Sequence, residues 1–214
     1  MTTSHKKVVI LDYQMGNVAS VIKAFEKLGA NVKLSRNKND IKRADYLILP
    51  GVGAFGDGMK NLNRSGIINS VSRQVRKGVP FLGICLGMQL LAETGTEFGE
   101  HKGLGWIRGK VIKLKAPTLP HIGWNDIKVA KGKNILNNLP DNNFYFVHSY
   151  ILRPENKSVI AATCKYGQEF TAAIEQGNIF GTQFHPEKSQ TAGLKLLENF
   201  LNYTKRSSPS NATP

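Results

Sequence analysis

Apolar and polar residues alternate along the first half of the chain in blocks that predict buried strands and amphipathic helices. Residues 7–12 form a short apolar run that is typical of a buried strand, and further strands are expected at residues 31–34, 45–49 and 79–84. Helical spacing of apolar residues predicts helices over residues 18–28, 67–77 and 86–93, and Gly29 suits the position after the first of them. Strands that alternate with helices predict parallel βαβ units and a doubly wound sheet.

The second half of the chain changes its pattern. Residues 105–115 alternate between apolar and polar side chains, as a half-exposed strand does. Further strands are expected at residues 144–150, 159–164, 171–175 and 179–184, and a closing helix at 191–203. Because turn residues rather than helices separate these strands, we expect an antiparallel or mixed extension packed on the parallel core.

Length and composition predict one α/β domain over residues 1–206 with a polar, proline-containing and disordered tail at 207–214. We expect no signal peptide, because the first apolar run is too short. No apolar run approaches the ~20 residues of a membrane-spanning helix, so we expect no membrane association. Two cysteines make a poor disulfide framework, which indicates free thiols and a cytoplasmic location.

The formal net charge of +14 admits nucleic acid, an anionic ligand or an acidic protein partner. Many of the lysines are scattered along the chain, which is also typical of a solvated surface. Because no basic run is interleaved with aromatic residues, we expect no nucleic-acid partner. The charge by itself does not identify a ligand.

Candidate chemistry begins at Cys85. An apolar strand runs into Gly83-Ile84-Cys85-Leu86-Gly87 and a helix follows, which is the layout of a nucleophile elbow with sulfur in place of a hydroxyl. Small neighbours prevent clashes in such a tight turn, and a helix N-terminus favours a thiolate. A buried structural cysteine remains the alternative at this point.

A base and its orienting group follow the last predicted strand. Residues i and i+2 of an extended segment point to the same side, so the Glu187 carboxylate can hold the His185 imidazole in one tautomer. Pro186 favours the extended conformation at His185. Nucleophile, base and orienting group are the parts that a cysteine hydrolase needs, although a surface turn is the alternative for His-Pro-Glu alone.

Acyl transfer also needs hydrogen-bond donors for an oxyanion. The amide of Leu86 is one candidate, and a second is expected from the glycine-rich loop at residues 50–53, which follows its own strand. Ligands collect at the carboxyl ends of strands in open α/β sheets. A simple tight turn remains the alternative for this loop.

Together these residues resemble the class I (triad) glutamine amidotransferases. The shared motifs are Pro-Gly-x-Gly, Gly-Ile-Cys-Leu-Gly-Met-Gln and a late His-Pro-Glu, in that order and over nearly the whole chain. Three further segments make the chain similar to the branch of glutaminase subunits of imidazole glycerol phosphate synthases. These segments are Asp12-Tyr13 with Gly16-Asn17, Pro-His-Ile-Gly-Trp-Asn at 120–125, and Tyr-Phe-Val-His-Ser-Tyr at 145–150.

The resemblance implies a flavodoxin-like fold and hydrolysis of L-glutamine to glutamate and ammonia, with no cofactor and no metal. It implies that Cys85 attacks the side-chain amide, that His185 shuttles protons and that Glu187 orients His185. By the same resemblance, the amides of Val52 and Leu86 form the oxyanion hole. Glutamine is then held by Gly53, Gln89 and Ser149.

The resemblance also implies that a (β/α)8-barrel cyclase subunit receives the ammonia in a heterodimer, in histidine biosynthesis. Matching positions at or near that interface are Asn17, Trp124, Tyr145 and Lys188. The alternative is a paralogue that supplies ammonia to a sugar-amidinating synthetase of surface-polysaccharide biosynthesis. A partner-independent γ-glutamyl hydrolase and a non-catalytic scaffold are further hypotheses, and intact catalytic motifs disfavour the scaffold.

Overall fold

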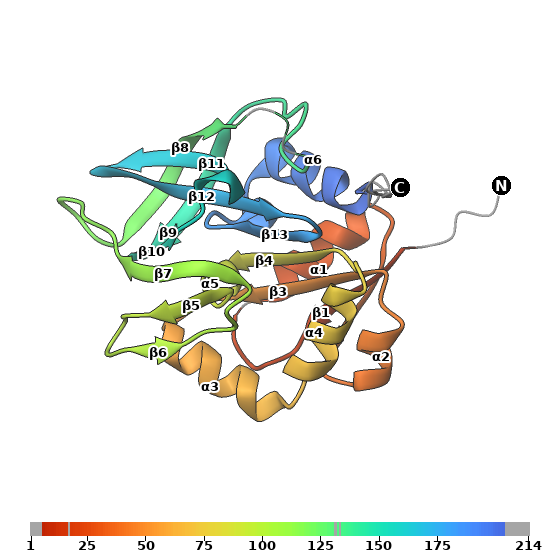
Figure 1. Ribbon diagram of the computed structural model, residues 1–214. Helices are drawn as coiled ribbons and strands as arrows, with labels where there is room; N and C mark the ends of the chain where they lie inside the picture. The colour runs from red at the N-terminus through yellow and green to blue at the C-terminus, as the bar shows by residue number, and fades with distance from the viewer. Residues whose placement is uncertain (1–5, 17, 131, 133, 204–214) are drawn as a thin grey trace, which may run out of the picture.

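The computed structural model describes residues 6–16, 18–130, 132 and 134–203 (Figure 1). The tail that we predicted to be disordered, residues 207–214, lies outside the described residues, so that prediction stays a prediction. Among the described residues, no helix is long and apolar enough to span a bilayer.

A nine-stranded sheet forms the centre of the molecule, in the order β2-β1-β3-β4-β13-β12-β11-β8-β9. Its first five strands are parallel: β2 (Asn31–Ser35), β1 (Lys7–Leu11), β3 (Tyr46–Gly51), β4 (Phe81–Cys85) and β13 (Ile179–Thr182). The remaining four are antiparallel: β12 (Gln168–Gln176), β11 (Ile160–Tyr166), β8 (His121–Val129) and β9 (Asn143–His148). The predicted parallel core with an antiparallel extension is therefore confirmed.

A second, four-stranded sheet packs beside the first (Figure 1). Its order is β10 (Tyr150–Pro154), β7 (Ile107–Lys113), β5 (Ala92–Gly95) and β6 (His101–Lys102). Strands β5 and β7 are parallel, and the other pairs are antiparallel. This sheet places the chain around Ser149 and Tyr150 next to the end of β4.

Helices cover both faces of the central sheet. The α-helices are α1 (Val18–Lys27), α2 (Lys38–Lys42), α3 (Phe55–Ser65), α4 (Ile68–Arg76), α5 (Leu86–Gln89) and α6 (Gln190–Leu201), and the 3-10 helices are η1 (Lys157–Val159) and η2 (Pro186–Lys188). Alternate residues of β1 enter different cores: Val8 and Ile10 pack with α1 and α6, whereas Val9 and Leu11 pack with α3 and α4. This two-sided burial explains why β1 is apolar throughout.

Two expectations about single elements were wrong. The helix predicted over residues 86–93 ends at Gln89, because Ala92–Gly95 instead pairs with β7 and β6. The strand predicted over residues 144–150 is broken at Ser149, where the chain passes from β9 to β10 in the other sheet.

Candidate active site

Cys85 is the last residue of β4 and immediately precedes α5. Its backbone dihedrals, φ 55° and ψ −110°, lie in a region that residues with a side chain rarely adopt. The turn requires its two glycines, because a Cβ on Gly87 would overlap the carbonyl oxygen of Leu49 and one on Gly83 would overlap the Gly87 carbonyl. The sequence-predicted arrangement of strand, strained nucleophile position and helix is present.

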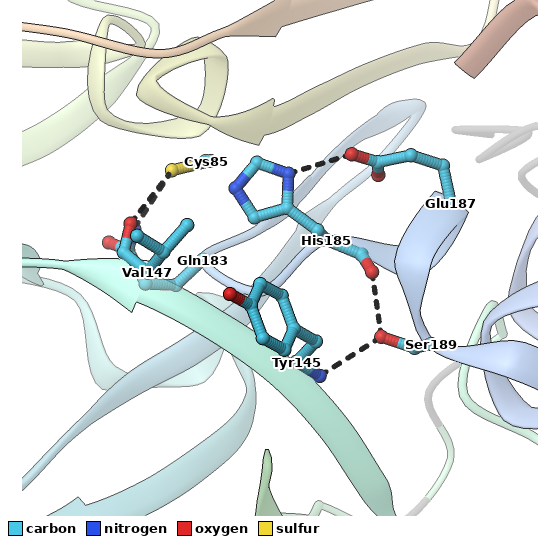
Figure 2. Close-up of polar contacts among 7 residues, drawn as sticks. All are labelled: Cys85, Tyr145, Val147, Gln183, His185, Glu187 and Ser189. Carbon is cyan, nitrogen blue, oxygen red and sulfur yellow. Dashed lines mark hydrogen bonds and ion pairs between the residues drawn. The ribbon is translucent and has the colours of Figure 1, made fainter. Parts of the chain in front are cut away.

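His185 lies beside Cys85 because neighbouring parallel strands carry the two residues. Strand β13 pairs with β4 so that Thr182 lies opposite Ile84, and His185 follows three residues after Thr182. The His185 Nδ1 and a Glu187 carboxylate oxygen are 2.7 Å apart, and the two side chains are only 4% and 3% exposed. Figure 2 shows the imidazole between the Cys85 sulfur and the Glu187 carboxylate.

The contact with Glu187 assigns the tautomer of His185. When neutral, the ring donates its Nδ1–H to the carboxylate and keeps Nε2 as the basic nitrogen. This buried Nε2 has no hydrogen-bond partner among the described residues. The nitrogen on the Cys85 side is therefore free to take a proton.

Opposing influences act on the protonation of His185. Burial by itself lowers the pKa of His185, because it penalises the charged imidazolium. The sulfur of Cys85 and the carboxylate of Glu187 favour the imidazolium, and together they outweigh burial and raise the pKa of His185 above its ordinary value. A cation beside the sulfur is the environment that a thiolate nucleophile requires.

Ser189 holds the base against β9. Its hydroxyl donates to the His185 carbonyl oxygen at 2.6 Å and accepts from the Tyr145 amide at 3.1 Å (Figure 2). In addition, the His185 amide donates to the Tyr145 carbonyl oxygen at 2.9 Å. These three bonds fix the segment that carries His185 and Glu187. Sequence reasoning missed Ser189, because nothing local distinguishes it from a helix-capping serine.

The sulfur of Cys85 also receives a hydrogen bond from a residue that the motifs did not single out. Gln183 is fully buried, and its Nε2 lies 3.7 Å from the sulfur. Its carbonyl oxygen accepts from Gln89 Nε2 at 3.1 Å, and that same nitrogen donates to the Tyr150 carbonyl oxygen at 2.9 Å. Two carboxamides therefore connect the sulfur to the first residue of β10.

The loop predicted to supply an oxyanion donor is adjacent to the elbow. Gly51 pairs with Cys85 in the register of β3 and β4, so Val52 and Gly53 follow directly beside the nucleophile. The Tyr13 hydroxyl donates to the Pro50 carbonyl oxygen at 2.8 Å and anchors the start of this loop. Burial raises the pKa of Tyr13, which keeps this hydroxyl protonated.

One pocket of about 190 Å³ brings most of the predicted residues together. It is lined by Val52, Gly53, Cys85, Leu86, Gln89, Glu97, Val147, His148, Ser149 and Tyr150. The nucleophile, both predicted oxyanion residues and all three predicted glutamine contacts are in this set. His185 and Glu187 do not line the pocket, and they lie buried beside Cys85.

Glu97 is a pocket residue that sequence reasoning missed. It follows β5 in the connection to β6, and its Oε2 accepts a hydrogen bond from the Phe55 amide at 2.9 Å. This bond joins the connection to the beginning of α3. Glu97 therefore places a carboxylate in the pocket that contains Cys85.

Three of the four predicted interface residues form one surface cluster. Trp124, which is 47% exposed, contacts the Tyr145 ring edge-on with 6.1 Å between ring centroids, and Lys188 Nζ lies 5.7 Å from the centre of the Tyr145 ring. Ile122, two residues before Trp124 on β8, is also exposed. The fourth predicted residue, Asn17, lies outside the described residues.

A chain of buried hydrogen bonds connects β8 to the pocket. His148 Nδ1 lies 3.0 Å from the Tyr150 carbonyl oxygen, and its Nε2 lies 3.1 Å from His121 Nδ1. Because a carbonyl only accepts, His148 carries its proton on Nδ1, and its Nε2 accepts a hydrogen bond from the Nδ1–H of His121. Asn125 Nδ2, 3.3 Å from His121 Nε2, completes a chain in which both imidazoles are neutral.

Among the described residues, no group of three or more His, Cys, Asp or Glu side chains is arranged to hold a metal ion. Both cysteines are free thiols. The chemistry that these residues support is nucleophilic attack by Cys85 with His185 as the acid and base.

Comparison with known proteins finds matches that cover most of the chain. The family model for class-I glutamine amidotransferases matches residues 9–203. The imidazole glycerol phosphate synthase subunit HisH of Aquifex aeolicus is 50% identical over 197 residues, covering 91% of this chain and 95% of the relative. The corresponding HisH subunit of Rhodopirellula baltica is 46% identical over 196 residues, covering 90% and 96%.

A solved structure shares the fold at low sequence identity. The PurLQS structure from Thermotoga maritima has a TM-score of 0.75 with 20% identity, and the match covers 93% of this chain and 99% of that chain. Identity at this level supports a common fold alone.

Proposed function

This chain belongs to the class-I glutamine amidotransferase family and is an enzyme of that kind, and from that premise we propose that it is the glutaminase subunit of an imidazole glycerol phosphate synthase. In this role it hydrolyses L-glutamine and supplies ammonia for histidine biosynthesis. The names of relatives that are 46% and 50% identical support the histidine pathway over a surface-polysaccharide pathway.

The single observation that carries the chemistry is the buried His185–Glu187 pair beside Cys85 at the strained end of β4. In the first step the Cys85 thiolate attacks the side-chain carbonyl carbon of glutamine. The amides of Val52 and Leu86 stabilise the oxyanion that forms. The His185 imidazolium then gives its Nε2 proton to the departing amino group, so that ammonia leaves and a γ-glutamyl thioester remains.

The second step returns the enzyme to its starting state. Neutral His185 takes a proton from water while the water oxygen attacks the thioester carbon. The carbon–sulfur bond breaks, glutamate is released, and the thiolate and imidazolium are restored. Glu187 keeps the ring oriented and stabilises its charge in both steps.

Pocket residues support glutamine as the substrate. The Glu97 carboxylate suits the α-ammonium group of an amino acid, because opposite charges at the pocket wall attract. Gly53, Gln89 and Ser149 contribute polar groups to the same pocket. Since both hydrogens of the Gln89 amide can be used by Tyr150 and Gln183, its carbonyl oxygen is the group left for the substrate.

The ammonia acceptor is a cyclase subunit with a (β/α)8-barrel fold, bound as a heterodimer. Transfer between subunits suits the chemistry, because ammonia released into neutral water is mostly converted to ammonium, which is not a nucleophile. The surface cluster of Ile122, Trp124, Tyr145 and Lys188 supports a protein interface here, since aromatic side chains such as Trp124 and Tyr145 are enriched in such surfaces. Free thiols at Cys85 and Cys164 support a cytoplasmic location.

The direct test measures glutamate release and product formation with and without the cyclase subunit and its nucleotide ligand. We expect slow glutamine hydrolysis by the chain alone and a large stimulation in the complete complex. Cys85→Ala is expected to lower the glutamine-dependent rate by roughly 10⁴-fold or more while leaving ammonia-dependent product formation intact. The matched Cys164→Ala variant keeps both activities, because Cys164 lies outside the pocket.

Two results would overturn parts of this proposal. Full glutaminase activity of the chain alone would contradict partner dependence. Glutamine-dependent synthesis that survives in Cys85→Ala would contradict the role of the sulfur.

A further inference from the structure

Positive charge is distributed unevenly along the chain. Residues 1–77 contain 14 Lys and Arg against 5 Asp and Glu, an excess of nine, out of a net charge of +14 for all 214 residues. The proposed catalytic chemistry does not account for this excess, because none of its residues is a Lys or Arg. The charge of residues 1–77 therefore calls for a separate explanation.

A groove between α2 and α4 concentrates part of this charge. It has a volume of about 400 Å³ and is lined by Lys38, Asn39, Lys42, Asn69, Ser70, Arg73, Gln74 and Lys77. Four of these residues are cations, the other four carry neutral hydrogen-bonding groups, and no carboxylate is among them. In Figure 1 both helices lie away from the arrowheads of β3 and β4, near which the catalytic pocket opens.

The one acidic residue of α2 does not neutralise the groove. Asp40 accepts a hydrogen bond from the Ser35 hydroxyl at 2.6 Å and pairs with Lys33 at 2.9 Å. The Ser35 bond, and secondly Lys33, lower the pKa of Asp40, so this carboxylate is ionised but already partnered. The four groove cations therefore repel one another with no carboxylate in the lining between them.

Gln74 adds a polar group to the wall of the groove. The residue is only 6% exposed, but its carboxamide is not among the polar groups that are sealed from solvent without a partner, so it is open to the groove. A molecule held in the groove can bond to it, because a carboxamide both donates and accepts hydrogen bonds.

We propose that the groove between α2 and α4 binds a small molecule that carries two or three linked phosphate groups. Lys38 and Lys42 are one helical turn apart, as are Arg73 and Lys77, which separates the members of each pair by about 6 Å along the helix axis. A short chain of phosphates spans that length. Ammonium and guanidinium groups are the preferred protein partners of phosphate oxygens, and neutral amide and hydroxyl donors complete the set.

The test uses the full chain and sodium tripolyphosphate as the probe, in isothermal titration calorimetry at about physiological ionic strength. We expect saturable binding that the double variant Lys42→Gln/Arg73→Gln weakens at least tenfold. A matched double variant, Lys23→Gln/Lys110→Gln, removes the same charge outside the groove lining and is expected to change affinity less than twofold. Gln74→Leu tests the carboxamide and is expected to weaken binding severalfold.

Glutamine hydrolysis by the partner-bound groove variants is expected to match wild type, which shows that they are folded and separates this site from the catalytic pocket. No binding, or equal weakening by both double variants, would overturn the proposal. A single-stranded oligonucleotide that displaces tripolyphosphate and binds more tightly through the same residues would also overturn it, in favour of nucleic acid.

Discussion

At the scale of single residues, we expect the reactivity of Cys85 to depend on the fully buried side chain of Gln183. Gln183 donates to the sulfur, and Gln89 holds the carbonyl end of the same carboxamide. Because both ends of Gln183 are engaged, its amide cannot turn over without losing two hydrogen bonds. Gln183 is therefore a positioning residue that stabilises negative charge on the sulfur.

Replacement of Gln183 by Leu is expected to slow alkylation of Cys85 by iodoacetamide at neutral pH by roughly tenfold, because a hydrogen bond to a charged group is worth ~1.5–3 kcal/mol and a bond to sulfur lies at the weak end. A Cys164→Ala background leaves Cys85 as the only thiol, and Gln168→Leu on β12 is the matched control. An unchanged alkylation rate would mean that Gln183 only fills space.

At the scale of elements, the passage from β9 to β10 determines the wall of the pocket. His148 ends β9, and its bond to the Tyr150 carbonyl oxygen holds the intervening Ser149 in place. Burial first, and the neighbouring His121 second, lower the pKa of His148 to about 3. Burial also lowers the pKa of His121. Strands β8 and β9 are therefore joined by the imidazoles of His121 and His148, which stay neutral in the folded protein.

This neutrality predicts a loss of stability in acid. The ordinary pKa of His148 is 6.5, so below that value the unfolded chain binds a proton that the folded chain rejects until about pH 3. The free energy of unfolding therefore falls as pH decreases through this range, and His148 alone accounts for about 3 kcal/mol at two units below its ordinary pKa.

Urea unfolding of the wild type and of His148→Gln at a series of pH values measures this effect. We expect the stability difference between the two proteins to move in favour of the variant as the pH falls, because glutamine does not titrate. Parallel curves would show that His148 is not held neutral by the fold.

The elements also show which features a sequence can predict. The turn at Cys85 and the pairing of His185 with Glu187 were predictable, because the strand–turn–helix pattern and the spacing of two residues are local. Residues 90–93 were assigned to a helix from their apolar pattern, but pairing of Ala92 with Ile107 in a different part of the chain overrides that preference. Local pattern thus predicted the strands of the parallel core well, but it missed α2 and α3 and most of the second sheet.

Contacts between distant segments explain the site residues that the sequence did not predict. Gln183 meets Gln89 across 94 positions of the chain, and Glu97 enters the pocket only through its contact with the start of α3. Neither Gln183 nor Glu97 is part of a motif whose spacing the chemistry requires. Their roles follow from the fold, in which β4, β13 and the second sheet meet at one edge.

At the scale of the whole molecule, the parallel half of the central sheet carries the candidate active site, and the antiparallel half carries the surface cluster. The parallel strands β3, β4 and β13 bring together, at their carboxyl ends, the residues that we propose as oxyanion loop, nucleophile and base. The antiparallel extension carries Trp124 and Tyr145 to the surface, and Ser189 ties Tyr145 to the segment that holds His185. A partner bound to this surface would contact Tyr145, which two hydrogen bonds through Ser189 connect to His185.

The central claim is that glutamine passes through a thioester on Cys85. The most direct measurement is an acid quench of the complete complex during turnover of radiolabelled glutamine, followed by proteolysis and mapping of the labelled peptide. The account predicts covalent label on the peptide that contains Cys85, retained in Cys164→Ala and absent in Cys85→Ala. Label on any other residue, or undiminished glutamine turnover by Cys85→Ala, would contradict it.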